Sequence, residues 1–167
     1  MSVEVVSVAD RPDLTGELWT FADGWPRFMQ EDLLGNMMGA LPRHFPRLQL
    51  LALNPADRTV VAKAHAVPFP WTGTPEELPE RGWDEVLGMG VRAGMYGRET
   101  QAVSALEISI RPHLRGTGLS AVVLAALREA VTKEGYADLF APVRPNGKPG
   151  EPQRRANRPP APTTPLA

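Results

Sequence analysis

The sequence predicts one domain of the α/β (α+β) class, with a mixed, mostly antiparallel central sheet flanked by helices. Its 167 residues suffice for a single domain with its own core. Two strand-like segments, 48–53 and 59–67, are separated by the turn formers of 54–58, which is typical of an antiparallel hairpin. Farther along, a strand, a glycine turn, a helix and a second strand follow one another over residues 106–143.

The N-terminal part of the chain predicts a short strand followed by two helices. Valines recur over residues 3–8 before a breaker at 10–13, which favours a strand that ends there. Apolar residues at helical spacing predict one helix from Leu14 to Ala22 and a second over 28–41, ended by Pro42. In the hairpin that follows, His65 shares a face with Lys63, and we interpret it as a structural histidine.

The segment 68–82 is too rich in proline and glycine for regular structure and is predicted to be a loop. A helix is expected over 83–98, although three glycines lower its stability. After the strand at 106–110, apolar residues from Leu119 to Val131 form one stripe of a helix that Gly135 closes. Residues 138–143 predict a last strand, which Pro142 assigns to an edge or to a place where neighbouring strands splay apart.

The turn between the strand and the helix is the best candidate for a binding site. It reads Arg-Gly-Thr-Gly-Leu-Ser over residues 115–120. Glycines at a helix start let a ligand approach the backbone, and the first amides of a helix have no intrahelical partner. With the helix dipole and Arg115, these amides favour a phosphate or pyrophosphate. The alternative is a plain strand-to-helix turn with glycines for tight packing.

At this turn the chain resembles the GNAT superfamily of N-acetyltransferases, with Arg115, Gly118 and Ser120 at the three fixed positions of the family's pyrophosphate-binding turn. The resemblance implies an enzyme that transfers an acetyl group from acetyl-CoA to a primary amine. It implies Glu107 as the general base, and the alternative is a surface or ion-paired carboxylate. The residues that it implies for binding the co-substrate are Ile108, Ile110, Arg115, Gly116, Thr117, Gly118, Leu119, Ser120 and Asn146.

The chain departs from the family pattern in two places. The segment 68–98 is much longer than the usual connection at this point, and its position suggests a lid over the acceptor cleft. The family's C-terminal helix, strands and general acid are not found: residues 1–148 are assigned to the GNAT-like domain and 149–167 to a disordered tail rich in proline and arginine. The open edge of the last strand would then invite pairing with another chain, which leaves a homodimer open.

Two other functions are therefore kept beside the enzyme. A non-catalytic CoA-binding remnant or interaction protein would retain the donor site without the far side of the acceptor site. An NAD(P)-binding protein is suggested by Gly116, Gly118 and Ala121, which fit G-x-G-x-x-[GA], with Asp138 about 20 residues on. The fit is superficial, because Asp138 begins a strand instead of ending one and the N-terminal half is antiparallel.

Composition limits the partners. The net charge of -1 gives no overall field that would recruit nucleic acid or an anionic membrane. The chain has no cysteine, and its three histidines show no metal-ligand spacing, so no metal is expected. No signal peptide and no apolar run long enough for a membrane helix is found, and we expect a cytoplasmic protein whose partner is a small-molecule amine.

Overall fold

A computed structural model describes residues 2–21 and 33–143. Within these residues five strands form one sheet in the order β1-β2-β3-β4-β5. The strands are β1 (Glu4–Ser7), β2 (Gln49–Leu53), β3 (Val60–Phe69), β4 (Ala102–Ile110) and β5 (Leu139–Phe140). The first four are antiparallel to their neighbours, and only β5 runs parallel to β4. The predicted mixed, mostly antiparallel sheet is confirmed.

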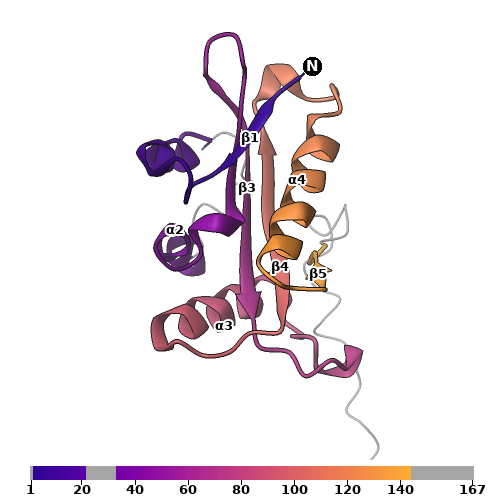
Figure 1. Ribbon diagram of the computed structural model, residues 1–167. Coiled ribbons are helices and arrows are strands. Elements are labelled where there is room, and N and C mark those ends of the chain that lie inside the picture. The colour runs from indigo at the N-terminus through magenta and orange to yellow at the C-terminus, as the bar shows by residue number, and fades with distance from the viewer. Residues whose placement is uncertain (1, 22–32, 144–167) are drawn as a thin grey trace, which may run out of the picture.

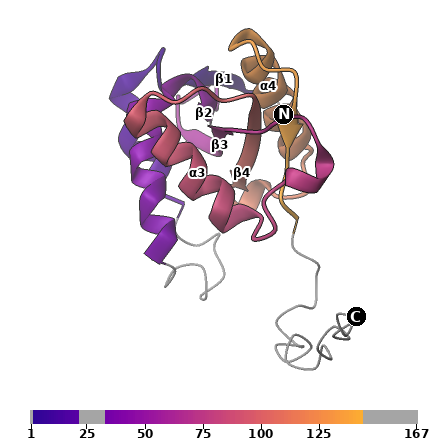
Figure 2. The same ribbon diagram turned by 90° about the horizontal axis from the view of Figure 1, so that it is seen from below.

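Helices cover both faces of this sheet. They are η1 (Pro12–Trp19), η3 (Leu33–Ala40), α2 (Leu41–His44), η4 (Pro46–Leu48), η5 (Pro75–Glu77), α3 (Trp83–Tyr96), η6 (Pro112–Leu114) and α4 (Leu119–Lys133), where η marks a 3-10 helix. The helix α4 lies on one face of the sheet, and η1, α2 and α3 lie on the other (Figures 1 and 2). In the part of the chain that the structure describes, no helix is both long and apolar enough to cross a membrane.

The two N-terminal helices differ from the prediction. The first is a 3-10 helix that ends at Trp19. Of the second, the described part is a 3-10 helix up to Ala40, and α2 then continues through Pro42 instead of stopping before it. The proline is tolerated because it stands in the first turn of α2, where the missing N–H would have no intrahelical acceptor.

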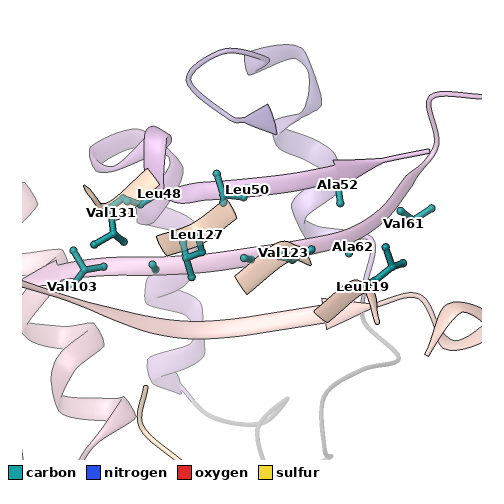
Figure 3. Packing of buried hydrophobic residues seen from close by; sticks show 12 residues of the cluster. Leu48, Leu50, Ala52, Val61, Ala62, Val103, Leu119, Val123, Leu127 and Val131 are labelled. Atoms are coloured by element: carbon teal, nitrogen blue, oxygen red, sulfur yellow. The ribbon is translucent and has the colours of Figure 1, made fainter. Parts of the chain in front are cut away.

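The face of the sheet that carries α4 is packed with apolar side chains. Along α4, Leu119, Val123, Leu127 and Val131 recur every four residues and are all buried. They pack against Leu48, which precedes β2, and against five residues of the sheet: Leu50, Ala52, Val61, Ala62 and Val103 (Figure 3). The small alanines of β3 on this face leave room for the larger side chains of the helix, which is the ordinary way to fill a core without voids.

The opposite face has two separate apolar clusters. One joins η1 to β1, β2 and the start of β3 through Leu18, Leu51 and Val60, among others. The other joins α2 and α3 to the far end of β3 through Leu41, Leu87 and other residues. Buried polar side chains of β2, β3 and β4 occupy the sheet between them: Gln49, Lys63, His65, Ser104 and Glu107.

The helix α3, which forms the second half of the segment predicted as a lid, is part of this second cluster. Its residues Val86, Leu87 and Val91 are buried against the sheet. Its glycines also have a packing reason: a Cβ on Gly90 would lie 2.2 Å from a methyl group of Val67, and one on Gly94 would lie 2.8 Å from Cβ of His44. Gly90 therefore allows α3 to pack closely on β3, and Gly94 allows it to pack closely on the end of α2.

Candidate active site

The first feature of the candidate site is an open edge of β4. The short strand β5 pairs with β4 only at Val103 and Ser104. Among the described residues, no strand pairs with positions 105–110 on this side. Pairing between the two strands thus stops before Pro142, where a splay is predicted. The carbonyl of Leu106 accepts a hydrogen bond from the indole N–H of Trp83 (3.0 Å), and among the described residues no strand pairs with Ile108 and Ile110 on this side.

The direction of the backbone groups along this edge follows from one hydrogen bond. The amide of Arg111 donates to the carbonyl of Val61 (3.0 Å), so the backbone of Arg111 faces β3. Residues of an antiparallel strand alternate in the side to which their N–H and C=O point. Ser109 therefore also faces β3, whereas Ile108 and Ile110 direct their backbone groups toward the open edge, and their side chains pack against the α4 cluster.

The glycine turn lies at the end of this edge. Gly116 and Gly118 have φ angles of 78° and 84°, in the left-handed region that favours glycine. Gly118 is the N-cap of α4, and no side chain caps the helix there. Within the described ranges, the amides of Gly116, Thr117 and Gly118 have no backbone acceptor. The turn is exposed to solvent, so these donors and the positive end of the α4 dipole are available to an anion.

The candidate base, Glu107, lies on the other side of β4, toward η1. Its carboxylate is buried and pairs with the ammonium group of Lys63, with Oε2 and Nζ 3.2 Å apart. The hydroxyl of Ser109 donates a short hydrogen bond to its other oxygen. Lys63 also donates to the carbonyl of Leu18 (2.9 Å). Burial lowers the pKa of Lys63, and the neighbouring Glu107 opposes this shift.

A β-bulge explains why Glu107 faces this way. His65 lies opposite Glu107 and Ala66 lies opposite Ala105, so Leu106 is an extra residue in β4. Ala105 packs with the α4 cluster, whereas Leu106 packs with the cluster of α3 on the opposite face. The next residue, Glu107, also faces that side, where it meets Lys63, so the bulge places two successive side chains on one face.

His65 is fully buried beside this ion pair. The side-chain nitrogen of Gln49 donates to the carbonyls of Phe45 and Ala66 (2.9 Å each), so the Gln49 oxygen accepts from Nδ1 of His65 (2.8 Å). This contact fixes the tautomer with the proton on Nδ1. Burial, with a smaller contribution from Lys63, lowers the pKa of His65 to about 3, so the ring is neutral at physiological pH. The indole of Trp19 stacks on it, with ring centroids 5.5 Å apart.

The structure thus brings most of the predicted site residues onto one strand–turn–helix unit. Glu107, Ile108 and Ile110 lie on β4, and residues 115–120 follow it. Asn146 lies outside the described residues. Sequence reasoning did not identify Lys63 as the partner of Glu107, because Lys63 lies opposite Ser109 only in a register that the sequence does not specify.

Comparisons with known proteins agree with this architecture. No family model matches the sequence. The chain is 25% identical over 154 residues to the arginine N-acetyltransferase avaD of Aspergillus versicolor, a match that covers 85% of this chain and 53% of that protein. The chain therefore spans about half the length of this curated relative.

Solved structures show the same fold. The loading GNATL domain of CurA from Lyngbya majuscula superposes with a TM-score of 0.62 at 16% identity, over 92% of this chain and 70% of that one. An aminoglycoside acetyltransferase from an uncultured soil metagenomic sample gives a TM-score of 0.51 at 13% identity, over 100% of this chain and 99% of the other. An aminoglycoside 6′-N-acetyltransferase of Acinetobacter baumannii gives 0.51 at 11%, over 99% and 100%. The resemblance to the GNAT superfamily is thereby confirmed, and the fold of this chain is the GNAT fold.

Proposed function

We propose that this chain transfers an acetyl group from acetyl-CoA to the primary amine of a small molecule. The curated relative is named as an N-acetyltransferase of arginine, and two structural relatives are named as aminoglycoside acetyltransferases. Their names agree on the transferred group and differ in the acceptor. The proposal accordingly specifies acetyl transfer to an amine and leaves the acceptor to be determined by experiment.

The open edge of β4 is the observation that carries this proposal. The edge runs directly into the glycine turn, so an extended chain that pairs with Ile108 and Ile110 would end at the unpaired amides of Gly116 to Gly118. Coenzyme A has this form: its pantetheine arm carries amide groups that can bond to a strand edge, and its pyrophosphate suits a helix N-terminus. The residues present therefore fit the co-substrate.

In this reaction the amine nitrogen forms a bond to the acetyl carbon and the carbon–sulfur bond breaks. The amine loses one proton and the departing thiolate gains one. The chain would contribute mainly by holding the two substrates in line, with a backbone amide of β4 polarising the thioester carbonyl. We assign to Glu107 the role of accepting the proton, directly or through a water molecule.

Replacement of Gly118 by alanine tests the donor site. A methyl group at a φ of 84° disfavours the native turn, so Gly118→Ala is expected to weaken acetyl-CoA binding about tenfold. Gly135→Ala is the matched control: it has a φ of 88° at the far end of α4, and a Cβ at either position would meet open space. Isothermal calorimetry gives the affinity of each variant for acetyl-CoA. Thermal unfolding checks that the two substitutions lower the stability of the fold equally.

Equal affinities of the two variants for acetyl-CoA would show that the glycine turn is not part of the donor site. A wild-type protein whose melting temperature rises with NADPH and not with acetyl-CoA would favour the dinucleotide-binding alternative. Binding of acetyl-CoA with a selective loss in Gly118→Ala would support the proposal.

A coenzyme A-binding protein without acetyl transfer is the second candidate, and the ion pair of Glu107 favours it. The carboxylate is buried at 8% exposure and is engaged by both Lys63 and Ser109, so it is not a freely available base in this structure. Such a pair also has a purely structural reading, since it ties η1 to the sheet through Leu18.

Turnover separates the two candidates. Thiol release from acetyl-CoA is measured with a panel of amines that includes L-arginine and an aminoglycoside, for the wild type and for Glu107→Gln. The enzyme reading expects turnover on at least one amine and a loss of 10²-fold or more in kcat for the variant. Equal turnover in both proteins would contradict the role of Glu107, and binding of acetyl-CoA without turnover on any amine would favour the second candidate.

A further inference from the structure

A cavity of about 450 Å³ lies at the end of the sheet where the turn between β2 and β3 meets the segment after β4. These two segments lie at the same end of the molecule (Figure 1). Part of its wall is apolar and comes from Leu14 of η1 and from Val60 and Val61 of β3. The volume falls in the range of small-ligand sites. No residue of this cavity belongs to the donor site described above.

Arg111 gives the cavity a positive charge. Its guanidinium donates to three neutral oxygens: the carbonyl of Val60 (3.2 Å), the carbonyl of Thr20 (2.7 Å) and the hydroxyl of Thr20 (2.7 Å). The ring of Phe21 covers it, with the guanidinium carbon 4.0 Å from the ring centroid. Among the described residues no carboxylate pairs with Arg111. A half-buried guanidinium with two N–H groups left is a strong partner for an oxyanion.

Two further basic side chains line the cavity, Arg58 and His113, against one acidic side chain, Glu17. Arg58 also pairs with Glu4 at the surface. Its backbone has a φ of 63°, the left-handed conformation that glycine adopts with the least strain. The turn thus holds an arginine in a conformation that glycine adopts with less strain.

The cavity is within reach of both substrates of the proposed reaction. His113 is three residues from Gly116, and three residues span at most about 11 Å. Glu107 and Ser109 of β4 and Arg111, the residue after it, alternate along the chain and share one face, so Arg111 lies about 13 Å from Glu107. An anionic group of the acyl donor or of the acceptor could therefore extend from the reaction site to Arg111.

We propose that this cavity binds a phosphate or carboxylate group of one of the two substrates, with Arg111 as the main contact and Arg58 and His113 beside it. The inference rests on the proposed function and adds to it a determinant of substrate choice. The anion is either the 3′-phosphate of coenzyme A or an acidic group on the amine acceptor. In the second case the acceptor is an amine that also carries a carboxylate or phosphate, in contrast to a polycationic aminoglycoside.

Matched ligand pairs test this inference and identify the source of the anion. Calorimetry compares coenzyme A with 3′-dephospho-coenzyme A. Thiol release compares L-arginine with L-argininamide, and glucosamine 6-phosphate with glucosamine, as acceptors of the acetyl group. The wild type is expected to prefer the anionic member of at least one pair about tenfold, and Arg111→Gln should reduce this preference below about threefold.

Because Arg111 also holds the end of η1, Arg58→Gly serves as a second variant. It should keep the melting temperature of the wild type, since glycine relieves the turn, and still weaken the same preference. Arg98→Gln, which replaces an arginine that does not line the cavity, should leave it unchanged.

A wild type that binds coenzyme A but prefers neither anionic partner overturns this inference alone. So does a preference that survives in both Arg111→Gln and Arg58→Gly. Failure of coenzyme A to bind the wild type at all would instead overturn the proposed function, and this inference with it.

Discussion

On one face of β3, Ala62, Ala64 and Ala66 belong to the apolar cluster beneath α4. On the other face of the same strand, Lys63 and His65 are equally buried but polar. The first face needs only two elements, a sheet and one amphipathic helix. The second face is complete only when groups from η1, β2 and β4 are all in place.

The two faces differ in the free-energy cost of assembling them and in the chemistry that they can support. Apolar burial is non-directional, and it tolerates small displacements. Buried charges carry a desolvation cost that only well-placed partners offset, and such groups are typical of functional sites. Glu107 also lies on the polar face, next to the open edge of β4. The directional contacts are therefore on the side of the sheet that we assign to chemistry.

Removal of Lys63 should give the largest effect on stability. In Lys63→Met the carboxylate of Glu107 is left buried without its cation, which is expected to cost about 3–5 kcal/mol in the free energy of unfolding. In the double variant Lys63→Met/Glu107→Leu no charge remains, and most of this loss should be recovered. Recovery is incomplete because the carbonyl of Leu18 still lacks its donor. Urea unfolding of the three proteins measures these differences.

The apolar face is the control for this prediction. Leu127→Ala should cost about 2–5 kcal/mol, and adding Val123→Ala should make the protein less stable still, because each truncation removes more packed surface. On the apolar face the second substitution should therefore add to the loss of stability. On the polar face the second substitution should reverse most of that loss. A double variant at Lys63 and Glu107 that is less stable than Lys63→Met would show that the two faces do not differ in this way.

Much of the apolar half could be predicted from the sequence. The four-residue spacing from Leu119 to Val131 is a local pattern that predicts the observed helix. The alternation in 106–110 predicts the observed strand, although the bulge turns Leu106 to the face opposite to Ile108 and Ile110. The glycine turn was found for the same reason, because its residues are contiguous. Such features depend on neighbours in the chain, which a sequence displays directly.

The polar half could not be predicted in the same way. Its contacts join residues far apart in the chain, such as Lys63 with Leu18 and with Glu107. They depend on the register of β3 with β4 and on the bulge at Leu106, and no local pattern specifies either. His65 was interpreted as a structural histidine, and its contact with Gln49 agrees with that interpretation, but neither its complete burial nor its tautomer could be predicted.

His65 gives a smaller and pH-dependent test of the same polar face. Burial and Lys63 lower its pKa from 6.5 to about 3, so the folded protein keeps the ring neutral while the unfolded chain takes up a proton below pH 6.5. The unfolded state then binds more protons, and stability falls as the pH is lowered from 6.5 toward 3. Between pH 7 and pH 5 this group should contribute a loss of about 2 kcal/mol in the free energy of unfolding.

Urea unfolding at both pH values should show this loss in the wild type and a correspondingly smaller one in His65→Gln, whose side chain does not titrate. An equal loss in both proteins would mean that His65 already takes up its proton in the folded state, and that the polar face is more accessible to water than its burial indicates.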